Sequence, residues 1–361
     1  MPALTTFPYG DDAFYLFSIA KHLANGHGPT VDGINLTNGF QPLIVLLYTP
    51  IFWLCGSNSW LAVRWTFLLN GAIAALTVWA IAVLIRKIER APGSENFSTP
   101  TIGAAIWTFT FTIFAQTTNG LETGLSSLLI FISLIFYAKI DSTSRGWTLG
   151  LVLGFAVLAR IDAAILVAII VLTLLVKKRT RLAIVTGGMA LLVSAPWWLF
   201  NWFYFGSLMP TSGQAENIWP LPPHENIYRA TEAISNILSL IFYLPNSLNY
   251  LLRILWLLII LGGIVFLIYR THLINRMRRT FRMDILWSLA IFSIVLFFYY
   301  TLFFRAPHFL ERYFEPARML WSVCVAAGVS IFWKEKIGRK IIIAAAVIGV
   351  VFSLDRYTTD Y

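Results

Sequence analysis

The sequence has few of the charged residues and cysteines that soluble and secreted proteins use. Only 12% of its 361 residues are charged and 58% are hydrophobic, whereas an average soluble chain is about 25% charged and about 45–50% apolar. Its two cysteines, Cys55 and Cys324, lie far apart and outside any CxxC spacing. These shortages exclude a disordered chain, a disulfide scaffold and a soluble DNA-binding domain. We interpret both cysteines as packing residues.

The hydrophobic residues gather in blocks of roughly 12 to 25 residues, each bounded by charge. The blocks cover residues 43–55, 61–85, 101–117, 121–138, 147–159, 163–176, 182–200, 250–269, 285–304, 319–333 and 341–354. Such blocks are typical of lipid-facing helices. The sequence therefore predicts an all-α, polytopic transmembrane helix bundle with about ten spans.

Positive charge is concentrated in five of the loops between these blocks. The five loops contain 18 of the 27 Lys and Arg residues but only 5 of the 17 Asp and Glu residues. By the positive-inside rule they are predicted to be cytoplasmic. The net charge of +10 is then a consequence of topology and does not indicate a nucleic-acid partner.

The first block, residues 43–55, is too short to cross a bilayer. As a helix it would be about 20 Å long, against a hydrocarbon core of about 30 Å, so we predict an interfacial or re-entrant helix on the outer face. Residues 1–60 then form a first outer loop, 61–354 the bundle with outer loops 201–249 and 305–318, and 355–361 an outer tail. Because nothing apolar precedes this outer loop, we expect a first transmembrane helix to be missing from the sequence.

Two neighbouring aspartates, Asp11 and Asp12, begin a segment with helical periodicity. Its apolar residues are Ala13, Leu16, Phe17, Ala20, Leu23 and Ala24. A juxtamembrane amphipathic helix is expected here. The aspartates are either a helix-capping pair or an acidic site where a lipid-borne substrate presents its head group. The polar stretch 35–42 that follows either lines a cavity or is a solvated loop.

Ionisable residues also occur at the outer ends of later blocks, where they are costly and often functional. Glu122 begins one block, and Arg160 and Asp162 lie in the turn between the two short blocks 147–159 and 163–176. Segment 305–318 is the densest basic outer segment, with Arg305, His308, Arg312 and Arg318 beside Glu311 and Glu315. Arginine suits phosphate geometry. The alternatives are a self-satisfied Arg160–Asp162 pair and a solvated loop of mixed charge.

The five histidines form no HxxxH or HExxH pattern. No cofactor is therefore indicated with certainty. A divalent metal held by Asp11, Glu122 and His308 stays an open alternative.

Several short motifs resemble landmarks of one family. Asp-Asp-Ala-Phe-Tyr at 11–15 and Asn-Gly-Phe-Gln-Pro-Leu at 38–43 resemble the first outer loop of the GT-C superfamily. Its members are polyprenyl-phosphate-sugar-dependent glycosyltransferases such as protein O-mannosyltransferases and lipid A aminoarabinose transferases. Segments 120–123, 158–162 and 312–314 are similar to later landmarks of bacterial members.

The resemblance implies roles for individual residues. Asp11, with Asp12 adjacent, matches the catalytic aspartate and general base, and Glu122 matches a second carboxylate of the site. Gln41 stands where some branches have a basic ligand for the donor phosphate, so that role is expected to shift to Arg160, Arg305 or Arg312. The acceptor or sugar pocket is expected to include Asn38, Tyr15, Asp162 and Tyr313. From the resemblance, we expect the family's first span and the outer C-terminal domain of many members to be missing from this sequence.

The implied activity is transfer of a sugar from a polyprenyl-phosphate donor to an acceptor hydroxyl, with inversion, at the outer face of the plasma (inner) membrane. Such a reaction needs a base for the hydroxyl and positive charge for the departing phosphate. The acceptor, whether glycan, lipid or protein, is not indicated. Two alternatives remain: a transporter or flippase, which is expected to show repeats and mid-membrane sites, and a truncated, non-catalytic homologue.

Overall fold

The computed structural model describes residues 10–89, 99–208, 210–211, 222–238, 250–303, 310–333 and 339–340. Within these ranges the chain is helical and has no strand, only two isolated bridges, Thr30 to Leu36 and Glu89 to Phe281. The chain divides into two compact units. Unit 1 comprises Met1–Ala80 and Ile113–Ile218, and unit 2 comprises Ile81–Thr112 and Trp219–Tyr361. The predicted all-α class is confirmed for the described residues.

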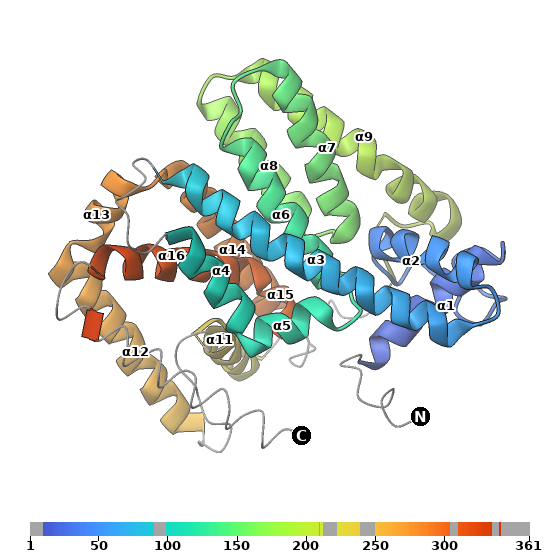
Figure 1. The fold of residues 1–361 in the computed structure, drawn as a ribbon, viewed down its shortest axis with the longest axis horizontal. Coiled ribbons are helices and arrows are strands. Elements are labelled where there is room, and N and C mark those ends of the chain that lie inside the picture. Colours follow the sequence, from blue (N-terminus) through green and yellow to red (C-terminus); the bar gives the residue numbers. More distant parts are fainter. Residues whose placement is uncertain are drawn as a thin grey trace. The chain divides into compact units, whose positions relative to one another are not determined.

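Unit 1 is built from helices that the apolar blocks predict. They are α1 (Asp11–Ala24), α2 (Pro42–Cys55), most of α3 (Ser59–Ile88), α5 (Phe111–Thr118), α6 (Thr123–Tyr137), α7 (Thr143–Ala159), α8 (Ala163–Val176) and α9 (Thr180–Phe205). Figure 1 shows α7, α8 and α9 packed beside one another, and α1 lying against α2.

Small residues bring α7 close to α9. A Cβ atom at Gly150 would lie 2.5 Å from the carbonyl oxygen of Thr186, and one at Gly154 would lie 2.5 Å from the Cβ of Val193. With Gly146 they form a stripe of small residues four apart, a pattern that allows close helix packing in membranes. The glycines of α7 therefore set the spacing of the closest helix pair in unit 1.

Helix α1 follows the periodicity expected from the sequence. Gly10 occupies the N-cap position and no side chain caps the helix, while Asp11 and Asp12 lie in the first turn. The helix buries Ala13, Leu16, Phe17, Ile19 and Ala20. Helix α2 covers the predicted block 43–55 and begins at Pro42, where a missing N–H costs nothing. The two helices meet through the rings of Phe17 and Tyr48, whose centroids are 5.4 Å apart.

Unit 2 is organised around α16 (Glu315–Phe332). This helix packs against α4 (Thr99–Phe109), α13 (Leu273–Thr280) and α14 (Met283–Phe303). The unit also contains the end of α3, α11 (Pro223–Leu238), α12 (Tyr250–Thr271) and α15 (Leu310–Tyr313). Residues Met319, Val323, Ala326 and Ala327 form the buried apolar face of α16.

Three of the described helices are long and apolar enough to cross a membrane: α3, α9 and α14. Together with the shorter apolar helices they make this a multi-pass membrane protein, while the number of ten spans and the division into 1–60, 61–354 and 355–361 stay predictions. Block 101–117 is not one helix, because the chain leaves helical geometry at Thr110 between α4 and α5. The Thr110 hydroxyl there donates to the carbonyl of Ile106, a bond that competes with regular helix geometry. Block 341–354 lies outside the described residues.

Candidate active site

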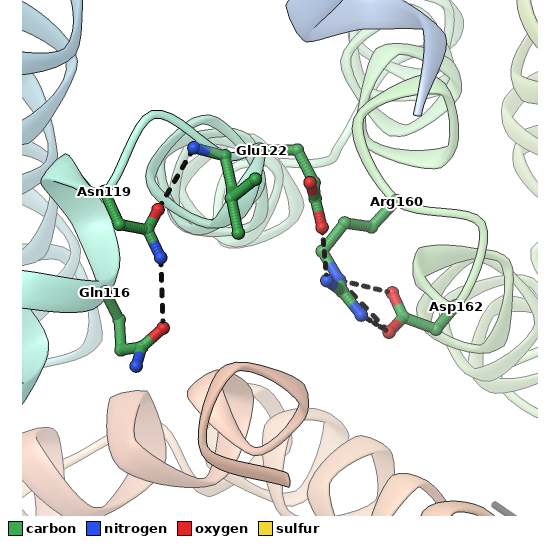
Figure 2. A network of polar contacts seen from close by, with 6 residues as sticks. Gln116, Asn119, Glu122, Arg160 and Asp162 are labelled. Atoms are coloured by element: carbon green, nitrogen blue, oxygen red, sulfur yellow. Dashed lines mark hydrogen bonds and ion pairs between the residues drawn. The ribbon is translucent and has the colours of Figure 1, made fainter. Parts of the chain in front are cut away.

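A buried ion network joins three helix ends of unit 1. Arg160 Nη1 donates to Glu122 Oε1 at 2.7 Å, and Arg160 Nη2 donates to Asp162 Oδ2 at 2.7 Å. Arg160 Nε also lies 3.2 Å from Asp162 Oδ2. Figure 2 shows the guanidinium held between the two carboxylates. Glu122 is 7% exposed and Arg160 is 6% exposed, so the network is shielded from solvent.

The local fold explains why these residue types stand at these positions. Glu122 is the N-cap of α6, Asp162 is the N-cap of α8, and Arg160 is the C-cap of α7. A helix carries partial positive charge at its N-terminus and partial negative charge at its C-terminus. Each carboxylate and the guanidinium therefore lie at the helix end that stabilises their charge. Arg160 has an extended backbone, with φ −152° and ψ 125°, which ends α7 before the turn into α8.

The network has one more carboxylate than it has guanidinium groups. When all three groups are ionised, its net charge is −1. Buried ions are tolerated when they are paired and hydrogen-bonded, and here every nitrogen of the Arg160 guanidinium has a carboxylate partner. The self-satisfied Arg160–Asp162 pair that the sequence left open is thus present, and it extends to Glu122.

Two further polar residues fix the turn that carries Glu122. The Tyr48 hydroxyl on α2 donates to the carbonyl oxygen of Gly120 at 3.1 Å and accepts a hydrogen bond from Asn70 Nδ2 on α3 at 2.8 Å. Tyr48 is completely buried and Asn70 is 2% exposed. Sequence reasoning missed both. The signal for Asn70 was available, since an amide inside an apolar block is costly unless it is paired.

The same turn is supported from its other side. Asn119 Oδ1 accepts the backbone N–H of Leu121 at 3.1 Å, and Asn119 Nδ2 donates to Gln116 Oε1 at 3.3 Å (Figure 2). Gly120 has φ +82°, a conformation that favours glycine. The backbone before Glu122 is therefore held by side chains from α2 and α5.

The acidic motif lies at the start of α1. Asp11 and Asp12 are both exposed, and Tyr15, one turn later, has its hydroxyl 3.3 Å from Thr37 Oγ1. This contact ties α1 to the loop that leads into α2.

The loop between α1 and α2 is organised by Asp32. Its Oδ1 accepts the backbone N–H groups of Ile34 at 2.9 Å and Asn35 at 2.8 Å, as well as the Thr30 hydroxyl. The hydrogen bonds from Asn35 and Ile34 hold the pKa of the Asp32 carboxyl well below its usual range. Hydrogen bonds to the ionised form favour that form.

Asn38 and Gln41 lie where this loop joins α2. Asn38 is completely buried, and its Oδ1 accepts the backbone N–H of Thr211 at 3.2 Å and the Thr211 hydroxyl at 2.9 Å. Within the described residues its amide nitrogen has no hydrogen-bond acceptor. Gln41 is the N-cap of α2 and makes no side-chain cap hydrogen bond.

The remaining predicted residues belong to unit 2. The ring of Tyr313 stacks on Tyr300 with centroids 4.2 Å apart and an interplanar angle of 9°, and the guanidinium carbon of Arg312 lies 5.4 Å from the Tyr313 centroid. Nearby in sequence, Arg318 is completely buried and lies 3.6 Å from Glu315. Arg305 and His308 lie outside the described residues.

No group of three or more His, Cys, Asp or Glu side chains in the described part of the chain is arranged to hold a metal ion. The proposed set of Asp11, Glu122 and His308 is not tested by this, because His308 lies outside that part. Glu122 is instead engaged by Arg160.

No family model and no curated protein matches this sequence. Two crystal structures of ArnT from Cupriavidus metallidurans do resemble it. The structure bound to undecaprenyl phosphate matches with a TM-score of 0.61 and 14% identity, over 94% of this chain and 59% of that chain. The apo structure matches with a TM-score of 0.57 and 15% identity, over 94% and 58%. This chain spans about three fifths of the length of ArnT, and its fold resembles that of ArnT.

Proposed function

We propose that this protein transfers a sugar from a polyprenyl-phosphate-linked donor to an acceptor hydroxyl at the outer membrane face. The observation that carries this proposal is the likeness, over 94% of the chain, to an ArnT structure bound to undecaprenyl phosphate. The buried carboxylate and guanidinium groups at the converging ends of α6, α7 and α8 support it, because such groups are costly unless they serve structure or chemistry.

The proposed reaction is a single displacement. The acceptor oxygen attacks the anomeric carbon and its proton passes to Asp11, while the bond from that carbon to the phosphate oxygen breaks and the phosphate leaves with the electron pair. Attack opposite the leaving group inverts the anomeric carbon. Asp11 is exposed on the first turn of α1 and is accessible to an acceptor, which suits a general base. Asp12 is its alternative.

Arg160 is proposed to act mainly through the carboxylates. Its guanidinium is engaged by Glu122 and Asp162, an arrangement that suits a positioning residue better than a free phosphate ligand. The donor phosphate is then assigned to Arg305, Arg312 or Gln41, and the sugar or acceptor pocket to Asn38, Tyr15, Asp162 and Tyr313. A divalent metal held with His308 remains part of the proposal only as an alternative to this metal-free arrangement.

The test is sugar transfer in membranes that contain the full chain, using a panel of radiolabelled polyprenyl-phosphate sugars. We expect one donor to be used, and Asp11→Asn to lower the rate by 100-fold or more, in line with the loss of a general base. Asp141→Asn is the matched control, since Asp141 is an exposed carboxylate paired with Arg145 and should leave the rate within twofold.

A further variant separates positioning from phosphate binding at Arg160. Arg160→Lys keeps the positive charge but loses the bidentate contact. If Arg160 positions Glu122, kcat falls while the KM for the donor changes little. A rise in the donor KM with kcat kept would assign Arg160 to the phosphate instead. Absence of transfer from every donor, in a correctly inserted chain that moves the donor lipid across the bilayer, would favour a flippase.

A further inference from the structure

A cavity outside the proposed catalytic residues lies at the corner between α12 and α13 in unit 2. Its volume is about 420 Å³, and it is lined by Thr271, His272, Asn275, Arg276 and Arg279. Each of these side chains can donate a hydrogen bond, and none is a carboxylate. A cavity lined in this way suits an anion that carries several acceptor oxygens.

The arginines around this cavity carry positive charge that is exposed. Arg276, Arg278 and Arg279 are all exposed on α13. Within the part of the chain that the structure describes, neither Arg278 nor Arg279 forms an ion pair, whereas Arg282 is paired with Asp284 at 3.0 Å. The guanidinium of Arg276 lies 5.9 Å from the ring centroid of Phe332 on α16. Among the described residues, those that line the cavity include two arginines and no carboxylate.

The backbone at this corner adds to the positive potential. His272 has φ +51° and separates α12 from α13. The first helical hydrogen bond of α13 runs from the N–H of Arg276 to the carbonyl of His272. The N–H groups of the turn before Arg276 therefore have no acceptor within the helix, and this helix end carries partial positive charge. Asn275, which lines the cavity, belongs to that turn.

An exposed apolar stripe on α12 leads to the cavity. It contains Leu258, Leu261, Val265 and Tyr269, all exposed; Leu255, Ile259 and Phe266 elsewhere on α12 are exposed as well. Their spacing of three and four residues places them on one face of the helix. Helix α12 ends at Thr271, which lines the cavity. Tyr269 is 79% exposed, as is common for tyrosines at a membrane–water boundary.

We propose that this cavity binds the phosphate-bearing head group of an anionic phospholipid whose acyl chain lies along the apolar stripe of α12. The donors and the arginines recognise the phosphate, and the stripe selects a lipid over a soluble phosphate ester. Anionic lipids attract basic segments next to membrane helices. This site is independent of the proposed sugar transfer, because it uses none of the residues assigned to that reaction.

The test is native mass spectrometry of the full chain released from a neutral detergent, after incubation with equal amounts of phosphatidylglycerol and phosphatidylcholine with the same acyl chains. We expect retained phosphatidylglycerol to exceed phosphatidylcholine by at least fivefold. Arg279→Gln should reduce retained phosphatidylglycerol about fivefold, which corresponds to one basic residue at a membrane surface.

Arg278→Gln is the matched control. It removes the same charge from an exposed position on the same helix, but Arg278 does not line the cavity, so the reduction should be less than twofold. Equal reduction by both variants would show diffuse attraction and overturn the cavity assignment. Equal retention of both lipids by the unmodified chain would also overturn it.

A second arm separates lipid from free phosphate. Glycerol 3-phosphate, added at the lipid concentration, should not displace phosphatidylglycerol, since it lacks the acyl chains that contact α12. Displacement at equal concentration would overturn the lipid assignment. Thermal unfolding of each variant in detergent checks folding, and phosphatidylglycerol should raise the melting temperature of the unmodified chain more than that of Arg279→Gln.

Discussion

Arginine has contrasting surroundings in the two units of this protein. In unit 1, Arg160 is 6% exposed and donates to two carboxylates. In unit 2, Arg279 is exposed beside a cavity with no acidic lining residue. A buried charge must be paired inside the protein because water cannot reach it. An exposed arginine is solvated and stays available to a ligand. The same residue type therefore holds structure together in one unit and offers a binding surface in the other.

The largest expected effect comes from removing the buried arginine. Arg160→Ala removes the cation that bridges the buried carboxylates of Glu122 and Asp162, and we expect a loss of about 3–5 kcal/mol in unfolding free energy. Arg145→Ala, which removes the exposed ion pair with Asp141, should cost about 1 kcal/mol or less. Denaturant unfolding in detergent, followed by tryptophan fluorescence, measures both. Similar losses of unfolding free energy in the two variants would contradict the expectation that the buried ion network stabilises the protein more than the exposed ion pair does.

The next effect tests the close packing of α7 against α9. A Cβ at Gly150 would meet the Thr186 carbonyl oxygen at 2.5 Å, so Gly150→Ala should force α7 away from α9 and cost about 1–3 kcal/mol. Gly188 on α9 has nothing within 4 Å of its added Cβ. Gly188→Ala should therefore be neutral or stabilise by up to about 1 kcal/mol. The melting temperatures of the two variants measure this difference. A lower melting temperature for Gly188→Ala would contradict the expectation that only the glycine facing the other helix is needed.

A smaller effect is expected at the tyrosine that supports the Glu122 turn. Tyr48→Phe removes the buried hydroxyl that bonds Gly120 and Asn70, and should cost about 1 kcal/mol. The comparison is Tyr15→Phe. The Tyr15 hydroxyl that this variant removes lies on an exposed side chain, 3.3 Å from Thr37 Oγ1. That variant should be close to neutral in the same unfolding assay. A neutral Tyr48→Phe would mean that the turn does not depend on α2.

The smallest effect is local and depends on pH. Because the folded pKa of Asp32 is depressed, its ionised form stabilises the loop at neutral pH, and this contribution is lost as the pH falls through the ordinary and then the folded pKa. Limited proteolysis of loop 25–41 should show no increased cleavage between pH 7 and pH 5. Asp32→Ala should be cleaved faster throughout that range. Cleavage that rises in the unmodified chain near pH 6 would contradict the depressed pKa.

Helix positions were largely predictable because their signals are local. The block 163–176 coincides with α8, Ala163–Val176, and the block 43–55 with α2, Pro42–Cys55. The length of an apolar block and the charges beside it are properties of one segment. Each block can therefore be interpreted without the rest of the chain. The break at Thr110 was not predicted, because block 101–117 has no proline or glycine near that residue.

The composition of the candidate site was only partly predictable. Glu122, Arg160 and Asp162 were each recognised as ionisable residues at block ends, and the Arg160–Asp162 pair is adjacent in sequence. Glu122 lies 38 residues from Arg160, and no local pattern joins them. Tyr48 and Asn70 were missed for the same reason, because their hydrogen bonds connect α2, α3 and the turn at Gly120.

The sequence by itself determined that this chain is helical and membrane-embedded and where its charges lie, because hydrophobicity, helical period and charge are properties of short segments. Only the tertiary structure decided which charges meet. That choice depends on the packing of α6 against α7 and on the convergence of three helix ends at Arg160. Packing over long sequence separations sets these contacts, and it turns isolated ionisable residues into a paired network.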